Sequence, residues 1–432
     1  MFVLCAARFF WIINRFAVNL FTWDQWGFND ATVFEQHSLW QIFRWQWGPH
    51  RLGIAGVLSK AIEPIGRWNT RYEAFGIGVV ICAATLLALY LKKRLIGRNG
   101  WEDLIIPVLF LTPAQYEIVI AAEPPASFAV PLLLVIAYGI SWTLEEMYWK
   151  YACVLVTNFF LIYTGYGIFM GPITMLLILL EWLTDKTGQY TAIYASCLAI
   201  SAISLGSFFI DYRPSPTMGC PVRLKWELLE RFWFLAVMFA NFLGLKASNA
   251  VALSIMVGGA MVVATFLAAL FFMRRFFVHG QSAGIRVVPF ALLGYSLLFS
   301  AAAAVGRACL GLGIAESSRY VTPLIVGLFG LYLGAITMKN KFWRCTYTSL
   351  LWVVVLLSSA HIHAQDRLTM NEYSTAKRAW RECYLASGDI QACTVATRFH
   401  VIPRLDHGFI DDTRLQQKLD FLKQNHLNLY SD

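Results

Sequence analysis

Residues 73–94 decide the fold class, and they read EAFGIGVVICAATLLALYLKKR. The stretch from about residue 73 to residue 91 is almost entirely apolar, and the basic run Lys92-Lys93-Arg94 follows it directly. A helix needs about 20 mostly apolar residues to cross the hydrocarbon core of a bilayer. Lys and Arg are enriched at the cytoplasmic ends of such helices. The stretch therefore predicts a membrane-spanning helix that enters the cytoplasm at its C-terminal end.

The whole chain has the composition of a membrane protein. Of its 432 residues, 58% are hydrophobic and 14% are charged, whereas about a quarter of the residues of a soluble domain are charged. Apolar runs follow one another from Phe2 to Ala364 with short polar loops between them. Backbone groups that face hydrocarbon must be bonded within their segment, and a β-barrel would show short alternating strands instead. We predict an all-α integral membrane protein with roughly ten to twelve transmembrane helices.

The net charge of +9 comes largely from short loops beside apolar runs. Basic residues cluster in the loops 92–98, 274–275 and 339–344. The positive-inside rule places these loops in the cytoplasm. We therefore expect no nucleic acid partner, and we expect the first loop and the C-terminal tail on the outer side of the membrane.

The chain divides into a transmembrane domain, residues 1–364, and a mainly helical extracytoplasmic tail, residues 365–432. A helix near 3–22 is expected to lead into a long first external loop, residues 23–72, with amphipathic elements. Further apolar runs lie near 104–122, 127–144, 150–164, 165–181, 190–210, 231–246, 249–272, 287–305, 321–338 and 345–361. If every run crosses the membrane, the alternation of sides fails between 104 and 246. One segment there is therefore re-entrant, interfacial or fused with its neighbour, either in the pair 150–164 and 165–181 or in the run 231–246.

The cysteine pattern predicts one disulfide in the tail. Six of the nine cysteines, Cys309 among them, lie in or beside apolar runs, where a cysteine usually behaves as a small hydrophobe. Cys383 and Cys393 fall in the tail, and a bridge between them is expected if that compartment is oxidising. Cys220 is a competing partner for either of them.

Candidate catalytic residues lie in the first external loop. Asp24 directly follows the first apolar run, and an ionisable residue at the membrane edge is a functional candidate. A carboxylate there can act as a general base for a hydroxyl that attacks an anomeric carbon. Asp30 is the second candidate for this base, and Trp23, Trp26 and Glu35 are candidates for sugar or acceptor contact. The tryptophans are equally typical of a belt at the lipid headgroups.

The same loop continues with His50 and Arg51, which are candidates for binding a substrate phosphate. The planar guanidinium of arginine suits a phosphate group well. The alternative is structural, because Asp24 or Asp30 can pair with Arg44 or Arg51 simply to fix the loop.

A second group of candidates precedes the run 321–338. Arg307, Arg319 and Tyr320 fall in a loop that the alternation places outside, so the two arginines stand against the positive-inside bias. Binding a lipid phosphate explains both arginines, and Tyr320 is a candidate for sugar or acceptor contact. The alternative is that Arg319 pairs with Glu316 while a serine caps the following helix.

The sequence assigns no protein metal site, because it lacks a CxxC pattern and its histidines lack metal-ligand spacing. An acidic outer loop can still hold a divalent cation together with a substrate phosphate, and this is the only cofactor that we consider. Glu117 and the stretch Glu123-Pro124-Pro125 are weaker site candidates.

At these residues the chain resembles the GT-C superfamily of polytopic membrane glycosyltransferases. The resemblance lies in Trp23-Asp24 after the first helix, in Gly48-Pro49-His50-Arg51 and in Ser318-Arg319-Tyr320. It covers residues 1–364 in layout, and only these motifs in detail. The chain departs from better-known subclasses because Gln25, not a second acid, follows Asp24.

The resemblance implies transfer of a sugar from a polyprenyl-phosphate carrier to a glycan, lipid or protein acceptor of the cell envelope. It implies a bacterial inner membrane as the location and the first-loop carboxylate, here Asp24, as the base. Two other function classes stay open. A flippase or transporter of a lipid-linked substrate would also need arginines that face phosphate, and a non-catalytic membrane scaffold would use the loop and the tail to bind a protein.

Overall fold

The computed structural model describes residues 1–51, 53–120, 128–213, 227–277, 282–361, 365–402 and 412–431. The candidates Cys220 and Glu123-Pro124-Pro125 lie outside these ranges. The protein is an all-α membrane protein, as the sequence predicts. Six of the described helical stretches are long and apolar enough to cross a bilayer, and the described strands are a single two-stranded hairpin.

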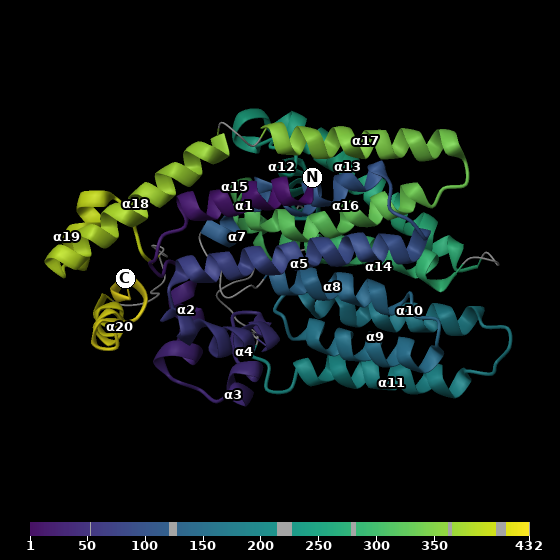
Figure 1. The fold of residues 1–432 in the computed structure, drawn as a ribbon, viewed down its shortest axis with the longest axis horizontal. Helices are drawn as coiled ribbons and strands as arrows, with labels where there is room; N and C mark the ends of the chain where they lie inside the picture. Colours follow the sequence, from purple (N-terminus) through teal and green to yellow (C-terminus); the bar gives the residue numbers. More distant parts are fainter. Residues whose placement is uncertain are drawn as a thin grey trace.

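The helices of the membrane domain form a bundle in which they run side by side (Figure 1). Their bounds are α1 Phe2–Phe16, α5 Thr70–Ile96, α6 Ile105–Phe110, α7 Glu117–Ile120, α8 Ala129–Ser141, α9 Met147–Ile162, α10 Met170–Thr184, α11 Thr191–Phe208, α12 Glu227–Asn241, α13 Ala247–Arg275, α14 Ala283–Arg307, α15 Leu312–Ala315, α16 Val321–Ile336 and α17 Lys341–His361. The six long apolar stretches contain α5, α10, α11, α13, α14 and α16.

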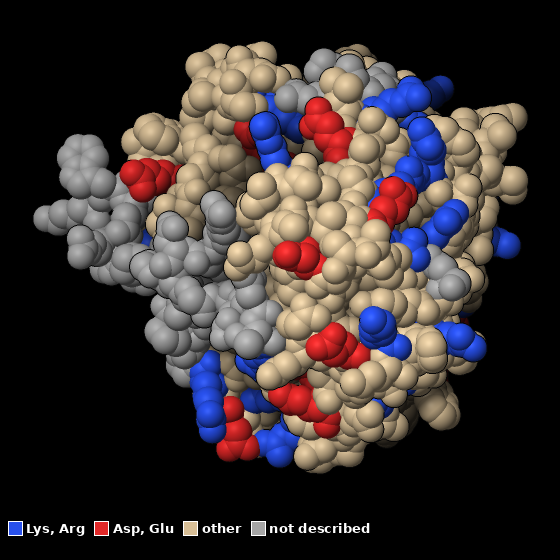
Figure 2. Space-filling view, turned by 90° about the vertical axis from the view of Figure 1, so that its left-hand side faces the viewer, with Lys and Arg blue, Asp and Glu red and all other residues tan. Residues whose placement is uncertain are grey.

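The first loop and the tail lie together at one end of the bundle, which we call the loop end (Figure 1). The first loop contains α2 Gln25–Asn29, α3 Leu39–Arg44, β1 Gln46–Trp47, β2 His50–Arg51 and α4 Gly53–Ile62, and the tail contains α18 Gln365–Ser387, α19 Ile390–Thr397 and α20 Asp412–Gln424. The three basic loops lie at the opposite end, the basic end. Figure 2 looks onto the loop end and shows acidic and basic side chains interspersed among uncharged ones.

The tail packs on the first loop through a hydrophobic core of its own. Phe21 and Trp26 from the loop region share this core with Trp380, Leu419 and Leu422 from the tail, and all five side chains are fully buried. Burial of apolar surface contributes about 25 cal/mol per Å², so large aromatic side chains dominate this contact. The tail therefore covers the first loop and anchors it.

The first helix is shorter than the predicted span of 3–22, because α1 ends at Phe16 and the chain continues in an extended form. Buried side chains bind the backbone that follows. The hydroxyl of Thr70 donates to the carbonyl of Val18 at 2.9 Å and accepts from the amide of Leu20 at 3.0 Å. Asn428 of the tail accepts from the amide of Phe21 at 3.2 Å. These bonds replace the helical ones that a buried backbone otherwise needs.

The predicted run 104–122 is broken into α6, a 3-10 turn at Pro113–Gln115 and α7. Proline has no amide hydrogen and kinks or breaks a helix unless it lies in the first turn. Pro113 begins the new turn. Gln115 donates a side-chain hydrogen bond of 2.6 Å to the carbonyl of Phe110, which α6 leaves without a helical partner. The break therefore has a local chemical cause.

The segment between α11 and α13 resolves the conflict in the alternation of sides. Asp211, just after α11, pairs with Arg44 of the first loop. Lys246, just before α13, pairs with Asp366 at the start of the tail at 2.8 Å. Both ends of the segment thus lie at the loop end. The run near 231–246, which corresponds to α12, is therefore the segment that does not cross, whereas α9 and α10 are two separate helices.

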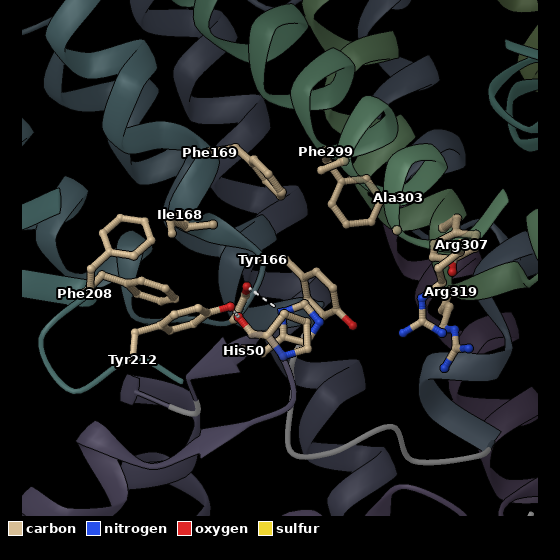
Figure 3. Close-up of a pocket in the computed structure, with 16 residues that line it drawn as sticks. His50, Tyr166, Ile168, Phe169, Phe208, Tyr212, Phe299, Ala303, Arg307 and Arg319 are labelled. Atoms are coloured by element: carbon tan, nitrogen blue, oxygen red, sulfur yellow. Dashed lines mark hydrogen bonds between the residues drawn. The ribbon is translucent and has the colours of Figure 1, made fainter. Parts of the chain in front are cut away.

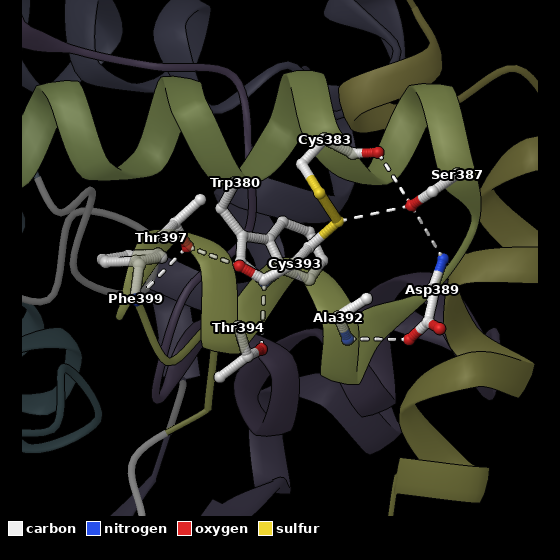
Figure 4. Close-up of a disulfide and its surroundings, with 9 residues drawn as sticks. All are labelled: Trp380, Cys383, Ser387, Asp389, Ala392, Cys393, Thr394, Thr397 and Phe399. Carbon is white, nitrogen blue, oxygen red and sulfur yellow. Dashed lines mark hydrogen bonds between the residues drawn. A yellow bond between two sulfur atoms is a disulfide. The ribbon is translucent and has the colours of Figure 1, made fainter.

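Cys383 and Cys393 form a disulfide that joins α18 to α19, with their Cα atoms 5.6 Å apart (Figure 4). The hydroxyl of Ser387 lies 3.3 Å from the sulfur of Cys393 and donates to the carbonyl of Cys383. Cys309 is disulfide-bonded as well, so its treatment as a small hydrophobe is wrong. Its position directly after an apolar run concealed that role.

Candidate functional site

A cavity of about 430 Å³ opens at the loop end between the β1–β2 hairpin, the turn after α9 and the ends of α11 and α14 (Figure 3). Five segments that are far apart in sequence contribute to its lining. The lining residues are Pro49, His50, Gly165, Tyr166, Ile168, Phe169, Phe208, Phe209, Tyr212, Phe299, Ala302, Ala303, Gly306, Arg307, Arg319 and Tyr320. Three of the four residues predicted to bind a substrate phosphate, His50, Arg307 and Arg319, therefore share one cavity.

Aromatic rings form the inner wall of the cavity. The ring of Tyr166 stacks on Phe128 with centroids 4.3 Å apart and meets Phe299 edge to face at 5.6 Å. Phe299 in turn contacts Tyr320 at 6.1 Å. Aromatic faces of this kind stack well against the apolar face of a sugar ring or against a lipid chain. The wall is therefore suited to a ligand that is apolar on one side.

His50 projects from the β1–β2 hairpin and is held in one orientation. Its Nδ1 lies 3.1 Å from the carbonyl oxygen of Gly165, and its ring packs on Tyr166 at 4.4 Å. A carbonyl only accepts hydrogen bonds, so Nδ1 carries the hydrogen in this contact, and Nε2 keeps a lone pair. Gly165 has φ of +80°, which a residue with a side chain rarely adopts.

The environment of His50 favours the neutral ring. The pKa of His50 is lowered to about 4, chiefly by burial and also by the positive charges of Arg307 and Arg319, while the hydrogen bond to Gly165 opposes the shift. The imidazole is therefore uncharged at neutral pH, and Nε2 is an acceptor of hydrogen bonds and protons.

Arg307 and Arg319 bring two positive charges to the cavity, one from the end of α14 and one from the turn before α16. Arg307 is the last residue of α14, and Arg319 lies in the 3-10 turn Ser318–Tyr320 that precedes α16. Figure 3 shows both guanidinium groups on the same side of the cavity. Within the described part of the chain, Arg307 has no hydrogen-bond or ion-pair partner. A cation without a protein partner is free to bind an anion.

Glu117 contacts Arg319 and the turn that carries it. Its carboxylate accepts from the hydroxyl of Ser317 at 2.5 Å and from the amide of Arg319 at 3.3 Å, and it lies 4.0 Å from Nε of Arg319. The expected pairing of Arg319 with Glu316 is not formed, because Glu316 accepts from the amide of Ser248 instead. Glu117 therefore positions Arg319 and fixes its turn.

Arg51 does not join this cavity, although it neighbours His50. Its guanidinium donates to three backbone carbonyls, those of Arg44, Phe208 and Ile210, at 2.5, 2.8 and 2.5 Å. The residue is 3% exposed. Its donors tie the first loop to the end of α11, which is a structural use of the side chain.

Asp30 faces the tail and not the cavity. Its carboxylate lies 2.5 Å from Nζ of Lys418 and 3.8 Å from Arg414. Burial lowers the pKa of Lys418, and the bond to Asp30 opposes that effect. Asp30 is therefore a partner in a buried ion pair between the first loop and α20.

Asp24 occupies the N-cap position of α2, but its side chain makes no hydrogen bond to the backbone of that helix. Among the cavity-lining residues that the structure describes, neither Asp24 nor Asp30 is present, and none carries a carboxylate. The structure therefore does not bring the two acids predicted as bases together with the arginines.

The remaining first-loop candidates also lie outside the cavity. Trp23 donates from its indole to the carbonyl of His400 at 3.3 Å, and Trp26 is fully buried in the core between loop and tail. Glu35 lies 3.2 Å from His37. Tyr320 alone among the predicted sugar contacts lines the cavity.

A second and more apolar cavity of about 430 Å³ lies between α4 and the first turns of α5. Two acids, Glu63 and Glu73, line it among aliphatic side chains. Glu63 accepts a hydrogen bond from the hydroxyl of Ser59. Burial raises the pKa of Glu63 to about 7, although this bond lowers it in part.

Sequence reasoning missed the aromatic wall. Tyr166 and Phe299 look like ordinary residues of apolar runs, because their role depends on contacts between helices. The turn Tyr163-Thr164-Gly165-Tyr166-Gly167 is the local signal in the sequence, because two closely spaced glycines interrupt the apolar runs there.

Among the described residues, no group of three or more His, Cys, Asp or Glu side chains is placed to hold a metal ion. The expectation of a divalent cation bound together with a substrate phosphate stays a prediction. Comparison of the chain with protein families, with curated proteins and with solved structures finds no match.

Proposed function

We propose that this protein is a membrane glycosyltransferase that moves a sugar from a polyprenyl-phosphate carrier to a cell-envelope acceptor. The observation that carries the proposal is the cavity in which His50, Arg307 and Arg319 meet beside an aromatic wall. The residues come from three separate segments, so their meeting is a property of the fold. A glycan, a lipid or a protein is the acceptor class that we consider.

The charges of the cavity fit a phosphate that is attached to a lipid. Arg307 has no protein partner in the described residues, and Arg319 is held in place by Glu117. Two guanidinium groups stabilise the negative charge that grows on a phosphate leaving group, which is the largest single contribution that such a site can make. In this role Arg307 and Arg319 bind the phosphate, while the aromatic wall receives the sugar.

The surroundings of the cavity fit a lipid chain. Phe209 lines the cavity and is 54% exposed at the same time, so the opening reaches the apolar surface of the bundle. Small residues of α14, Ala302, Ala303 and Gly306, leave the space open on the opposite side. A polyprenyl chain can therefore lie along the bundle while its phosphate faces the arginines.

The charges of the loops support the location that we propose. All three basic loops lie at the end opposite the cavity, and the positive-inside rule assigns that end to the cytoplasm. We place the cavity, the first loop and the tail on the outer face of a bacterial inner membrane.

The test is transfer of radiolabelled sugar from a panel of polyprenyl-phosphate sugars by the purified, reconstituted protein. Wild type is compared with the double variant Arg307→Gln/Arg319→Gln, and Arg344→Gln at the basic end serves as a matched control. We expect transfer by wild type and by the control, and loss in the double variant. No transfer by folded wild type, with donor binding retained, would favour a flippase or transporter, and no donor binding at all would favour a scaffold.

A further inference from the structure

This inference rests on the proposed transferase function and concerns the group that takes the proton of the acceptor. We infer that Nε2 of His50 is the general base of the reaction, in place of a first-loop carboxylate. Three observations lead to this assignment, and each is independent of the resemblance to a known superfamily.

The first observation is the composition of the cavity. Arginines, aromatic rings and His50 line it, and none of its described lining residues is an acid. The acid next to Arg319, Glu117, already accepts hydrogen bonds from the hydroxyl of Ser317 and from the amide of Arg319. Asp30 is occupied by Lys418 in the contact with the tail. His50 is therefore the group in the lining with a lone pair suited to accept a proton.

The second observation is the orientation of the ring. The 3.1 Å contact between Nδ1 and the carbonyl of Gly165 fixes the tautomer, and the packing on Tyr166 fixes the plane. In a neutral imidazole only one nitrogen carries a hydrogen, and the hydrogen bond that one nitrogen makes determines which of the two it is. Nε2 is consequently unprotonated, and an unprotonated nitrogen cannot donate to a phosphate oxygen.

The third observation is electrostatic. His50 shares the cavity with Arg307 and Arg319, whose charges favour the neutral ring before the donor binds. The phosphodiester of the donor carries one negative charge, which offsets the arginines and makes the imidazole more basic. The base therefore becomes stronger when the substrate is in place, which is the direction that catalysis requires.

The step balances as a single displacement. A lone pair of the acceptor oxygen forms a bond to the anomeric carbon, and the bond from that carbon to the phosphate oxygen breaks with its electron pair on the oxygen. The acceptor proton moves to Nε2 of His50. The products are the glycoside, polyprenyl phosphate with two negative charges, and an imidazolium that returns its proton to water.

The test compares three forms of the full-length protein in turnover and in donor binding. His50→Asn keeps an amide that can donate to the Gly165 carbonyl and removes Nε2, so it separates catalysis from loop structure. We expect its turnover to fall by about 100-fold or more, while its affinity for polyprenyl phosphate stays within about threefold of wild type. His50→Ala opens space for an exogenous base, and we expect added imidazole to restore part of its transfer.

The outcomes distinguish this assignment from the proposed function. Absence of transfer by folded wild type overturns both. Transfer that persists in His50→Asn overturns the assignment alone. Weakened donor binding with unchanged turnover in His50→Asn also overturns it, because His50 would then be a phosphate contact.

Discussion

The loop end contains two sets of charged residues that the sequence alone presents as equivalent, and the structure treats them in opposite ways. Asp30 of the first loop is buried and paired with Lys418 of the tail. Arg307 at the end of α14 lines a cavity and has no partner among the described residues. The first arrangement uses charge to join two parts of the protein. The second leaves charge available for a ligand.

The comparison indicates that a charge next to the membrane is a site candidate when it lines a cavity, and not when its contacts only join two parts of the protein. Arg51 and Arg307 are the same residue type and lie at the same end of the bundle. All three bonds of Arg51 go to backbone carbonyls, whereas Arg307 lines the cavity. A structure is needed to tell them apart, because pairing depends on residues that are distant in sequence.

The largest effect is expected for Arg307→Gln, which tests the unpaired side of the comparison. Loss of one preorganised donor to a developing negative charge typically costs about 10²- to 10³-fold in rate, so we expect transfer to fall by that factor. The melting temperature in detergent should stay the same, because a side chain without partners contributes about 0.5 kcal/mol or less to stability. A marked loss of stability with intact transfer would show that Arg307 has a structural role, like Asp30, and does not bind the ligand.

Asp30→Asn tests the paired side and should act mainly on stability. Removing one partner of a buried ion pair leaves the other charge uncompensated, at a typical cost of about 3–5 kcal/mol. We expect a large drop in melting temperature, and we expect the double variant Asp30→Asn/Lys418→Met to recover most of it. Transfer per folded molecule should be unchanged. Loss of transfer without loss of stability would restore Asp30 as a candidate base.

The fold was predictable to the extent that it depends on local apolar runs. The predicted span 73–91 lies within α5, which extends beyond it at both ends, to Thr70 and to Ile96. A long apolar run with a basic end leaves few alternatives. The end of α1 at Phe16 was not predictable, since the partners that replace its helical bonds, Thr70 and Asn428, are distant in sequence. The break at Pro113 had a visible signal in the proline.

The sequence predicts several residues of the candidate site, but it does not predict which of them lie together in one cavity. Two arginines against the positive-inside bias indicated a functional loop, and both line the cavity. The position of the first-loop acids beside the membrane makes them candidates, but this position carries no information about their contacts with the tail. Lys418 lies about 390 residues from Asp30, so no local pattern connects them.

Glu63→Gln adds a third kind of charge to the comparison, an acid in an apolar cavity whose side chain has only the hydroxyl of Ser59 as a hydrogen-bond partner among the described residues. The pKa of Glu63 is about 7 in the folded protein against 4.5 for the ordinary side chain, so its carboxylate opposes folding increasingly as pH rises from about 4.5 to 7. We expect the variant to be more stable than wild type by about 1–3 kcal/mol at pH 8 and equal to it near pH 4. Thermal unfolding in detergent at both pH values measures this. An equal effect at both values would contradict a buried, protonated acid.

Asp24→Asn should have the smallest effect. It tests whether the reacting groups lie in the first loop or in the cavity with Arg307 and Arg319. The side chain of Asp24 makes no capping bond at the start of α2, and the cavity lining does not include it. We therefore expect a change in stability of about 0.5 kcal/mol or less, and transfer equal to that of wild type. The measurement is the same transfer assay with a melting curve beside it. If transfer disappears while the melting curve is unchanged, the reacting groups lie in the first loop, and the arginine cavity then holds the phosphate of a donor whose sugar reaches toward Asp24.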